Sequence, residues 1–188
     1  DDFDYGKPVH LLDLNELPSP YLEGFLDTFT RSPYRPQIQT LRGCPFACKF
    51  CVSGRDTVKI RKFPMEQIKG ELRYIAERYK DHGHIDLQIV DDNFGLFPRD
   101  IEIAKYVGEV SDKIGHPKGV HFFNSKELNH ISYSVLEAIG NINQIGLNIS
   151  LQTDTPAALK AMGRKNLKEE KLEKALEWAQ NKKIETTT

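Results

Sequence analysis

Hydrophobic residues follow two different periodicities along most of the chain. Short apolar runs bounded by turn-forming residues, which are typical of strands, occupy residues 37–41, 85–90, 120–125, 144–151 and 183–188. Between these runs apolar residues recur every three or four positions, which predicts helices over 65–80, 98–114, 156–162 and 167–181 and another that Ser132 caps. Strands that alternate with helices predict parallel β-α-β units and an α/β fold.

Residues 1–35 depart from this alternation. Prolines such as Pro18, Pro20 and Pro33 interrupt any long period, and the pattern leaves one short helix near residues 21–27. We expect this segment to be a leader or linker that packs on the core. Residues 36–188 are then expected to form the main domain.

The number of strand and helix pairs limits the type of parallel fold. No Gly-x-Gly-x-x-Gly motif follows the first strand, so a dinucleotide-binding fold has no positive support. The remaining parallel arrangement is a barrel, but a closed eight-unit barrel needs about 250 residues. Because the 188 residues hold four units and the beginning of a fifth, we expect the chain to be a truncated piece of a longer protein.

Charge and composition disfavour several function classes. The chain has 26 Lys and Arg against 27 Asp and Glu, a formal net charge of −1, which makes nucleic acid and an anionic membrane poor partners. The chain has no run of about 18 apolar residues, the length that predicts a transmembrane helix. The acidic start, Asp1-Asp2-Phe3-Asp4, is unlike the basic beginning of a signal peptide. We therefore expect a soluble cytoplasmic protein.

All three cysteines lie within eight residues, with the spacing Cys-x3-Cys-x2-Cys at Cys44, Cys48 and Cys51. Thiolates so close in sequence are expected to converge on one metal centre, and soft thiolate ligands select zinc or an iron–sulfur cluster. Both usually take four protein ligands, so three cysteines leave one metal position open to a substrate or cofactor. Two alternatives stay open. In the first, a histidine is the fourth ligand of a zinc site. In the second, two of the cysteines form a disulfide and the third is a free thiol, although such short spacings would strain the disulfide.

This spacing, with Phe50 before the last cysteine and Gly43 and Gly54 on either side, resembles the signature of the radical SAM superfamily. The resemblance implies that the three cysteines hold a [4Fe-4S] cluster whose fourth iron binds the amino and carboxylate groups of S-adenosylmethionine. It also implies a partial (β/α)6 barrel, truncated here after about four units. The implied activity is reductive cleavage of S-adenosylmethionine to a 5′-deoxyadenosyl radical, with an electron from a donor such as flavodoxin or ferredoxin.

Polar residues follow the carboxyl ends of the predicted strands, where barrels of this kind carry their chemistry. Asp91 and Asp92 follow the second strand and offer a carboxylate to the ammonium group of S-adenosylmethionine. Arg164 resembles the family's arginine that binds the carboxylate, for which a forked guanidinium is suited. Without the cysteines, the paired aspartates would be interpreted as a turn or a helix cap, and Arg164 as a surface residue.

Three further cofactor contacts are implied by the resemblance. Ser150 and Gln152, at the end of the fourth strand, resemble the polar pair that contacts the cofactor, and Phe50 resembles the aromatic residue beside the adenine. The sequence assigns no residue to the substrate, and the substrate itself is unknown.

Four segments look most like the cobalamin-dependent branch of the superfamily, in which many members are methyltransferases: 13–20, 40–46, 91–94 and 150–153. An Asp-x-His-x-x-Gly cobalamin motif is missing, since residues 81–84 do not match it. Any cobalamin would therefore be bound by a domain outside this chain. The alternatives are a methylthiotransferase-like enzyme of the same superfamily, or a non-catalytic iron–sulfur or zinc-binding protein.

Overall fold

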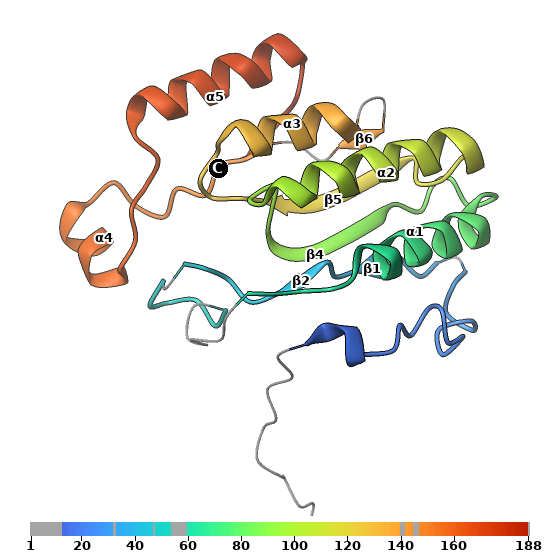
Figure 1. Ribbon diagram of the computed structural model, residues 1–188. Coiled ribbons are helices and arrows are strands. Elements are labelled where there is room, and N and C mark those ends of the chain that lie inside the picture. The colour runs from blue at the N-terminus through green and yellow to red at the C-terminus, as the bar shows by residue number, and fades with distance from the viewer. Residues whose placement is uncertain are drawn as a thin grey trace, which may run out of the picture.

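The computed structural model describes residues 13–31, 33–46, 48–53, 60–139, 142–144 and 147–187. The main sheet has four parallel strands in the order β1-β4-β5-β6, formed by Gln37–Ile38, Leu87–Phe94, Gly119–Asn124 and Asn143–Gln144 (Figure 1). Parallel neighbours need crossover connections, and helices supply them between β4, β5 and β6. The predicted α/β fold is confirmed.

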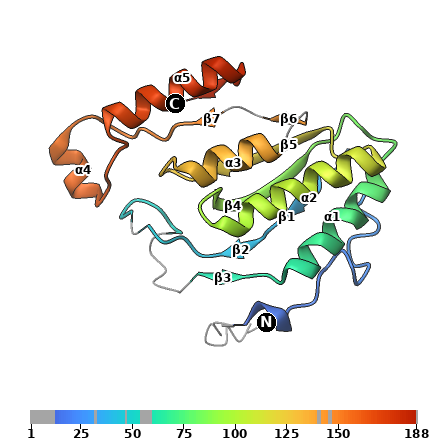
Figure 2. The same ribbon diagram turned by 45° about the horizontal axis from the view of Figure 1, so that its top comes forward.

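Helices α1 (Met65–Tyr79), α2 (Pro98–Ile114) and α3 (His130–Ile139) lie side by side on one face of this sheet (Figures 1 and 2). Their apolar stripes meet buried strand residues in one core, which includes Ile68, Leu72, Ile75, Leu87, Ile89, Ile103, Val107, Val120 and Val135. The first two helices begin beside a proline, as predicted, and α2 ends at Gly115, whose φ of 93° favours glycine. No helix within the described ranges is long and apolar enough to cross a bilayer.

The third helix begins two residues before Ser132, so the predicted cap is wrong. The Oδ1 atom of Asn129 accepts hydrogen bonds from the backbone N–H groups of Ile131 (2.8 Å) and Ser132 (3.2 Å) and caps the helix instead. The Ser132 hydroxyl donates to the carbonyl of Gly95 (3.0 Å), which ties α3 to the turn after β4.

The predicted strand 144–151 is divided between two sheets. Strand β6 lies at the edge of the main sheet, whereas β7 (Leu147–Asn148) pairs in parallel with β8 (Thr186–Thr187). Helix α5 (Glu169–Lys182) packs on this second sheet, and α4 (Pro156–Met162) precedes it. A second apolar cluster forms here from Leu128, Leu136, Leu147, Ile149, Ala175 and Ala179.

The side chain of Asn124, at the end of β5, joins the two sheets. Its Nδ2 atom donates to the carbonyl of Asn148 (2.8 Å), and its Oδ1 atom accepts from the N–H group of Asn148 (2.9 Å). Asn124 also pairs with Phe94 of β4 in the main sheet. The carboxyl ends of β4, β5 and β7 are therefore held next to one another.

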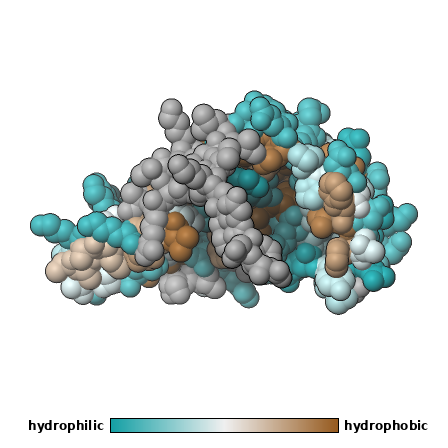
Figure 3. All heavy atoms as spheres, turned by 90° about the horizontal axis from the view of Figure 1, so that it is seen from below, coloured by the Kyte–Doolittle hydropathy of each residue, from teal (hydrophilic) through white to brown (hydrophobic). Residues whose placement is uncertain are grey.

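The described part of the leader is packed on the core without the predicted helix at 21–27. Residues 21–29 form successive turns, because Gly24 has a φ of 76°, and the one short 3-10 helix is η1 (Leu14–Glu16). The Tyr21 hydroxyl donates a hydrogen bond to the carbonyl of Gln37 and accepts one from its N–H group, which ties the leader to β1. The side chain of Phe25, by contrast, is 71% exposed. Figure 3, a view from below in Figure 1, shows hydrophobic patches among hydrophilic ones. The boundary at residue 35 stays a prediction, and residues 1–12 lie outside the described residues.

Candidate metal and cofactor site

The cysteine segment lies between two short strands beside the main sheet. Strand β2 (Leu41–Arg42) pairs antiparallel with β3 (Arg61–Lys62), and all three cysteines fall between them. The predicted first strand, 37–41, is thus divided between β1 and β2. Cys48 is buried, Cys44 and Cys51 are half-buried, and each is a free thiol.

Asp91 anchors the chain just before the cysteines. Its carboxylate accepts hydrogen bonds from the backbone N–H groups of Thr40 (2.7 Å) and Leu41 (3.3 Å) and from the Thr40 hydroxyl. Burial raises the pKa of Asp91 to about 6, against the lowering effect of these bonds. Asp91 continues the buried alternation of Leu87 and Ile89. It points into the protein and does not line the cavity described below, so the structure places it away from the role of ammonium acceptor.

The cysteines face a cavity of about 200 Å³ at the carboxyl ends of the strands. The side chains around it come from the cysteine segment, from the ends of β4, β5 and β7, and from the segment after α4: Cys44, Phe46, Cys48, Phe50, Cys51, Ser53, Asp92, Asn93, Phe123, Asn124, Lys126, Asn148, Ser150 and Arg164. The structure thus brings the cysteines together with four of the predicted cofactor contacts. Gln152 is exposed and is not among the lining residues.

Two hydrogen-bond donors outside the predicted cofactor contacts face the cysteine sulfurs. The Nδ2 atom of Asn93 lies 3.2 Å from Cys44 Sγ, and Lys126 Nζ lies 3.5 Å from Cys48 Sγ. Asn93 is the second-last residue of β4, and Lys126 comes two residues after β5, so the rule that chemistry gathers at strand ends points to both. Asp92 lies beside them and accepts a hydrogen bond from the Ser53 hydroxyl (3.1 Å).

The surroundings of Cys44 raise the pKa of its thiol. Burial raises the pKa of Cys44, and the nearby Asp92 carboxylate raises it further, whereas hydrogen bonds from the Phe46 backbone and the Asn93 amide lower it. A thiolate here gains from a metal cation that replaces the lost hydration. An unpaired thiolate at Cys44 is therefore disfavoured.

Arg164 is a buried cation beside the cysteine segment. It is 9% exposed, and its Nη2 atom donates to the carbonyl of Ser150, while its Nε atom has no acceptor among the described residues. Gly163, with a φ of 62°, ends α4 and turns the chain toward the cavity. The N–H group of Lys49 donates to the carbonyl of Met162 (3.0 Å), so the two segments are directly linked. A buried guanidinium with an unpaired donor is suited to a carboxylate ligand.

The three cysteines line one cavity, and their placement can be compared with the requirements of two kinds of metal site. Within the described ranges, no three Cys, His, Asp or Glu side chains are placed to hold one metal ion. A structural zinc requires four ligands at about 2.0–2.3 Å from one point. The thiolates of an iron–sulfur cluster bind different iron atoms, so they need only face one cavity, as the three cysteines do.

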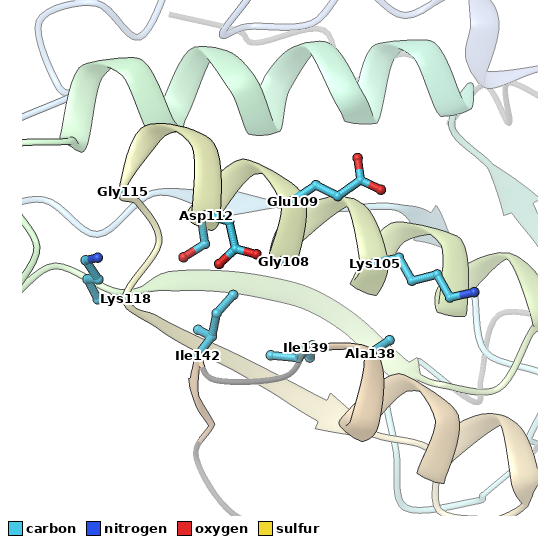
Figure 4. A pocket seen from close by; sticks show the side chains of 10 residues that line it. Lys105, Gly108, Glu109, Asp112, Gly115, Lys118, Ala138, Ile139 and Ile142 are labelled. Atoms are coloured by element: carbon cyan, nitrogen blue, oxygen red, sulfur yellow. The ribbon is translucent and has the colours of Figure 1, made fainter.

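A larger cavity, of about 560 Å³, lies at the opposite end of the strands (Figure 4). Its walls carry charges of both signs, Lys105, Glu109, Asp112 and Lys118, and Ile142 lies on its apolar side. Lys118 directly precedes β5, so this cavity is at the amino end of that strand. Parallel α/β folds bind their ligands at the carboxyl ends, which makes the smaller cysteine cavity the functional candidate.

Comparison with known proteins identifies the class to which this fold and site belong. The family model of the Radical SAM superfamily matches residues 38–188, and the chain belongs to this superfamily. Its fold is accordingly part of a radical SAM barrel.

Two methyltransferases are similar to this chain over most of its length. The chain is 32% identical over 169 residues to the cobalamin-dependent radical SAM methyltransferase TokK of Streptomyces tokunonensis. It is 31% identical over 171 residues to the 2-(S-pantetheinyl)-carbapenam-3-carboxylate methyltransferase of Streptantibioticus cattleyicolor. Each match covers 86% of this chain and 24% of the relative, so the chain spans about a quarter of the length of these proteins.

Proposed function

We propose that the chain is the core of a radical SAM enzyme in which Cys44, Cys48 and Cys51 hold a [4Fe-4S] cluster. The observation that carries this proposal is the gathering of three free thiols at one cavity, in a chain of this superfamily whose sequence contains no fourth cysteine. The cluster would supply the electron that cleaves S-adenosylmethionine to methionine and a 5′-deoxyadenosyl radical.

We propose that S-adenosylmethionine binds across the mouth of the same cavity. Arg164 would bind its carboxylate, because the guanidinium is buried and keeps one donor unpaired. Asp92 would accept from the ammonium group, Ser150 would contact the cofactor, and Phe50, which is 47% exposed, would stack on the adenine. A cavity of about 200 Å³ is smaller than the clefts of about 300–1,000 Å³ that enclose drug-sized ligands, so the cofactor would extend past these side chains.

We further propose that the whole enzyme is a cobalamin-dependent methyltransferase. The names of the two relatives support this reaction class, and cobalamin would then bind outside the chain described here. The substrate would be a small molecule, and a one-electron donor such as flavodoxin or ferredoxin would reduce the cluster. Thiol ligands require a reducing compartment, for which the cytoplasm is the natural candidate.

Metal analysis tests the proposed cluster. Full-length protein that is reconstituted anaerobically should contain about four iron atoms and about four sulfide ions per site. Cys48→Ala should lose most of this iron. Lys49→Ala, which changes the exposed neighbouring residue, is the control and should keep the wild-type iron content. Zinc without sulfide in the wild-type protein would contradict the proposal.

A further inference from the structure

We propose that Asn93 and Lys126 set the reduction potential of the cluster through hydrogen bonds to two of its cysteine ligands. This inference rests on the proposed function, because it requires that the cysteines hold a cluster. Neither Asn93 nor Lys126 would bind iron itself. Both residues act through the cysteines, so they are positioning residues and not catalytic ones.

Lys126 is held against one cysteine and one ring. Its Nζ atom lies 3.5 Å from Cys48 Sγ and 3.9 Å from the centre of the Phe46 ring. The side chain is half-buried, so water screens its charge less than on an open surface. An ammonium group between a sulfur and an aromatic face is stabilised by both neighbours, which fixes the charge beside the site.

Asn93 connects this lysine to a second cysteine. Its Nδ2 atom donates to Cys44 Sγ (3.2 Å), and its Oδ1 atom accepts from the backbone N–H group of Lys126 (3.4 Å). Asn93 is 8% exposed, so its amide has little access to competing water. The strand ends of β4 and β5 thus present two linked donors to the sulfurs of Cys44 and Cys48.

The sign of the effect follows from the charge of the cluster. Reduction transfers one electron from an external reductant to the cluster, with no proton, and makes the cluster and its thiolates more negative. Donors to the sulfurs and a nearby positive charge stabilise that reduced form, so they raise the reduction potential. A hydrogen bond from a charged donor is about twice as strong as one from a neutral donor, so Lys126 should have the larger effect.

A redox titration of the reconstituted full-length protein tests this inference. The protein is titrated with dithionite in the absence of S-adenosylmethionine, and the reduced cluster is followed by electron paramagnetic resonance. Lys126→Met, which keeps the length of the side chain and removes its charge, should have a lower midpoint potential than wild type. Lys126→Arg should stay close to wild type. Lys49→Met is the matched control, since it removes the same charge from an exposed lysine of the cysteine segment and should leave the potential unchanged.

The outcomes separate this inference from the proposed function. An equal midpoint potential in Lys126→Met and wild type would overturn the role of Lys126, and so would an equal shift in Lys49→Met, which would indicate only a change in net charge. A folded Lys126→Met protein that binds no iron would also overturn it, because the lysine would then be needed to assemble the site. A wild-type protein without a cluster would instead contradict the proposed function.

Discussion

At the scale of single residues, the main lesson concerns the two neighbouring aspartates. The sequence presents Asp91 and Asp92 as equivalent, but the pleat of β4 sends Asp91 into the protein and Asp92 toward the cavity. Alternation from Leu87 and Ile89 could have predicted the inward direction of Asp91. The partners in its hydrogen bonds, Thr40 and Leu41, lie 51 and 50 residues away in sequence and follow only from the fold.

The buried carboxylate of Asp91 predicts a pH dependence of stability. The pKa of Asp91 is about 6 in the folded protein against 3.8 for an ordinary aspartate carboxyl group, so the folded state keeps this proton to higher pH than the unfolded state. The free energy of unfolding should therefore fall as pH rises from about 4 to about 6 and then level off, by roughly 3 kcal/mol from this group alone. Urea unfolding across this range, compared with Asp91→Asn, measures the effect. If both proteins show the same pH slope in this window, the pKa of Asp91 is not raised.

The buried guanidinium of Arg164 predicts a loss of cofactor affinity on substitution. Arg164→Lys keeps the charge but loses the forked geometry, so the Kd for S-adenosylmethionine should rise about tenfold or more, measured by calorimetry on the full-length protein. Lys165→Ala, which removes an exposed neighbouring charge, is the control and should bind like wild type. Equal affinity in Arg164→Lys would exclude a bidentate contact.

At the scale of elements, the helices were more predictable than the strands. Regular apolar spacing and prolines give α1, α2, α4 and α5 to within about two residues. The strand pattern at 144–151 does not reveal that the chain leaves one sheet for another, because the partners of β6 and β7 are distant in sequence. The predicted cap of α3 is wrong because Asn129 and Ser132 are both good caps, and sequence alone does not show that the Ser132 hydroxyl donates to the distant Gly95 carbonyl.

The junction between the sheets predicts a stability effect at Asn124. Asn124→Ala removes both partners of the Asn148 backbone and should lower the free energy of unfolding by about 1–3 kcal/mol, measured by urea denaturation. Asn148→Ala keeps these backbone bonds and, among the described residues, loses a side-chain contact with the Ser150 hydroxyl, so its cost should stay at ~0.5 kcal/mol or less, as is usual for a more exposed position. Equal costs would mean that the backbone pairing does not hold the sheets together.

At the scale of the whole molecule, five separate segments meet at one cavity. The cysteine segment, the ends of β4 and β5, the residues after β7 and the segment after α4 each contribute side chains to it. The sequence predicts that the cysteines are metal ligands and that the carboxyl ends of the strands surround the site, because cysteine spacing and strand ends can both be recognised from neighbouring residues. The sequence does not predict which residues at the strand ends point into the cavity. It also does not predict the hydrogen bonds at Lys126, Asn124 and Met162, since these depend on packing between distant segments.

The most direct test of the central claim is the formation of 5′-deoxyadenosine. Reduced, anaerobic full-length protein supplied with S-adenosylmethionine should release 5′-deoxyadenosine and methionine, measured by liquid chromatography and mass spectrometry. Cys48→Ala should abolish this product. Release of 5′-deoxyadenosine by Cys48→Ala at the wild-type rate, or its absence from a cluster-loaded and reduced wild-type protein, would contradict the assignment of the cysteine cavity as the site of S-adenosylmethionine cleavage.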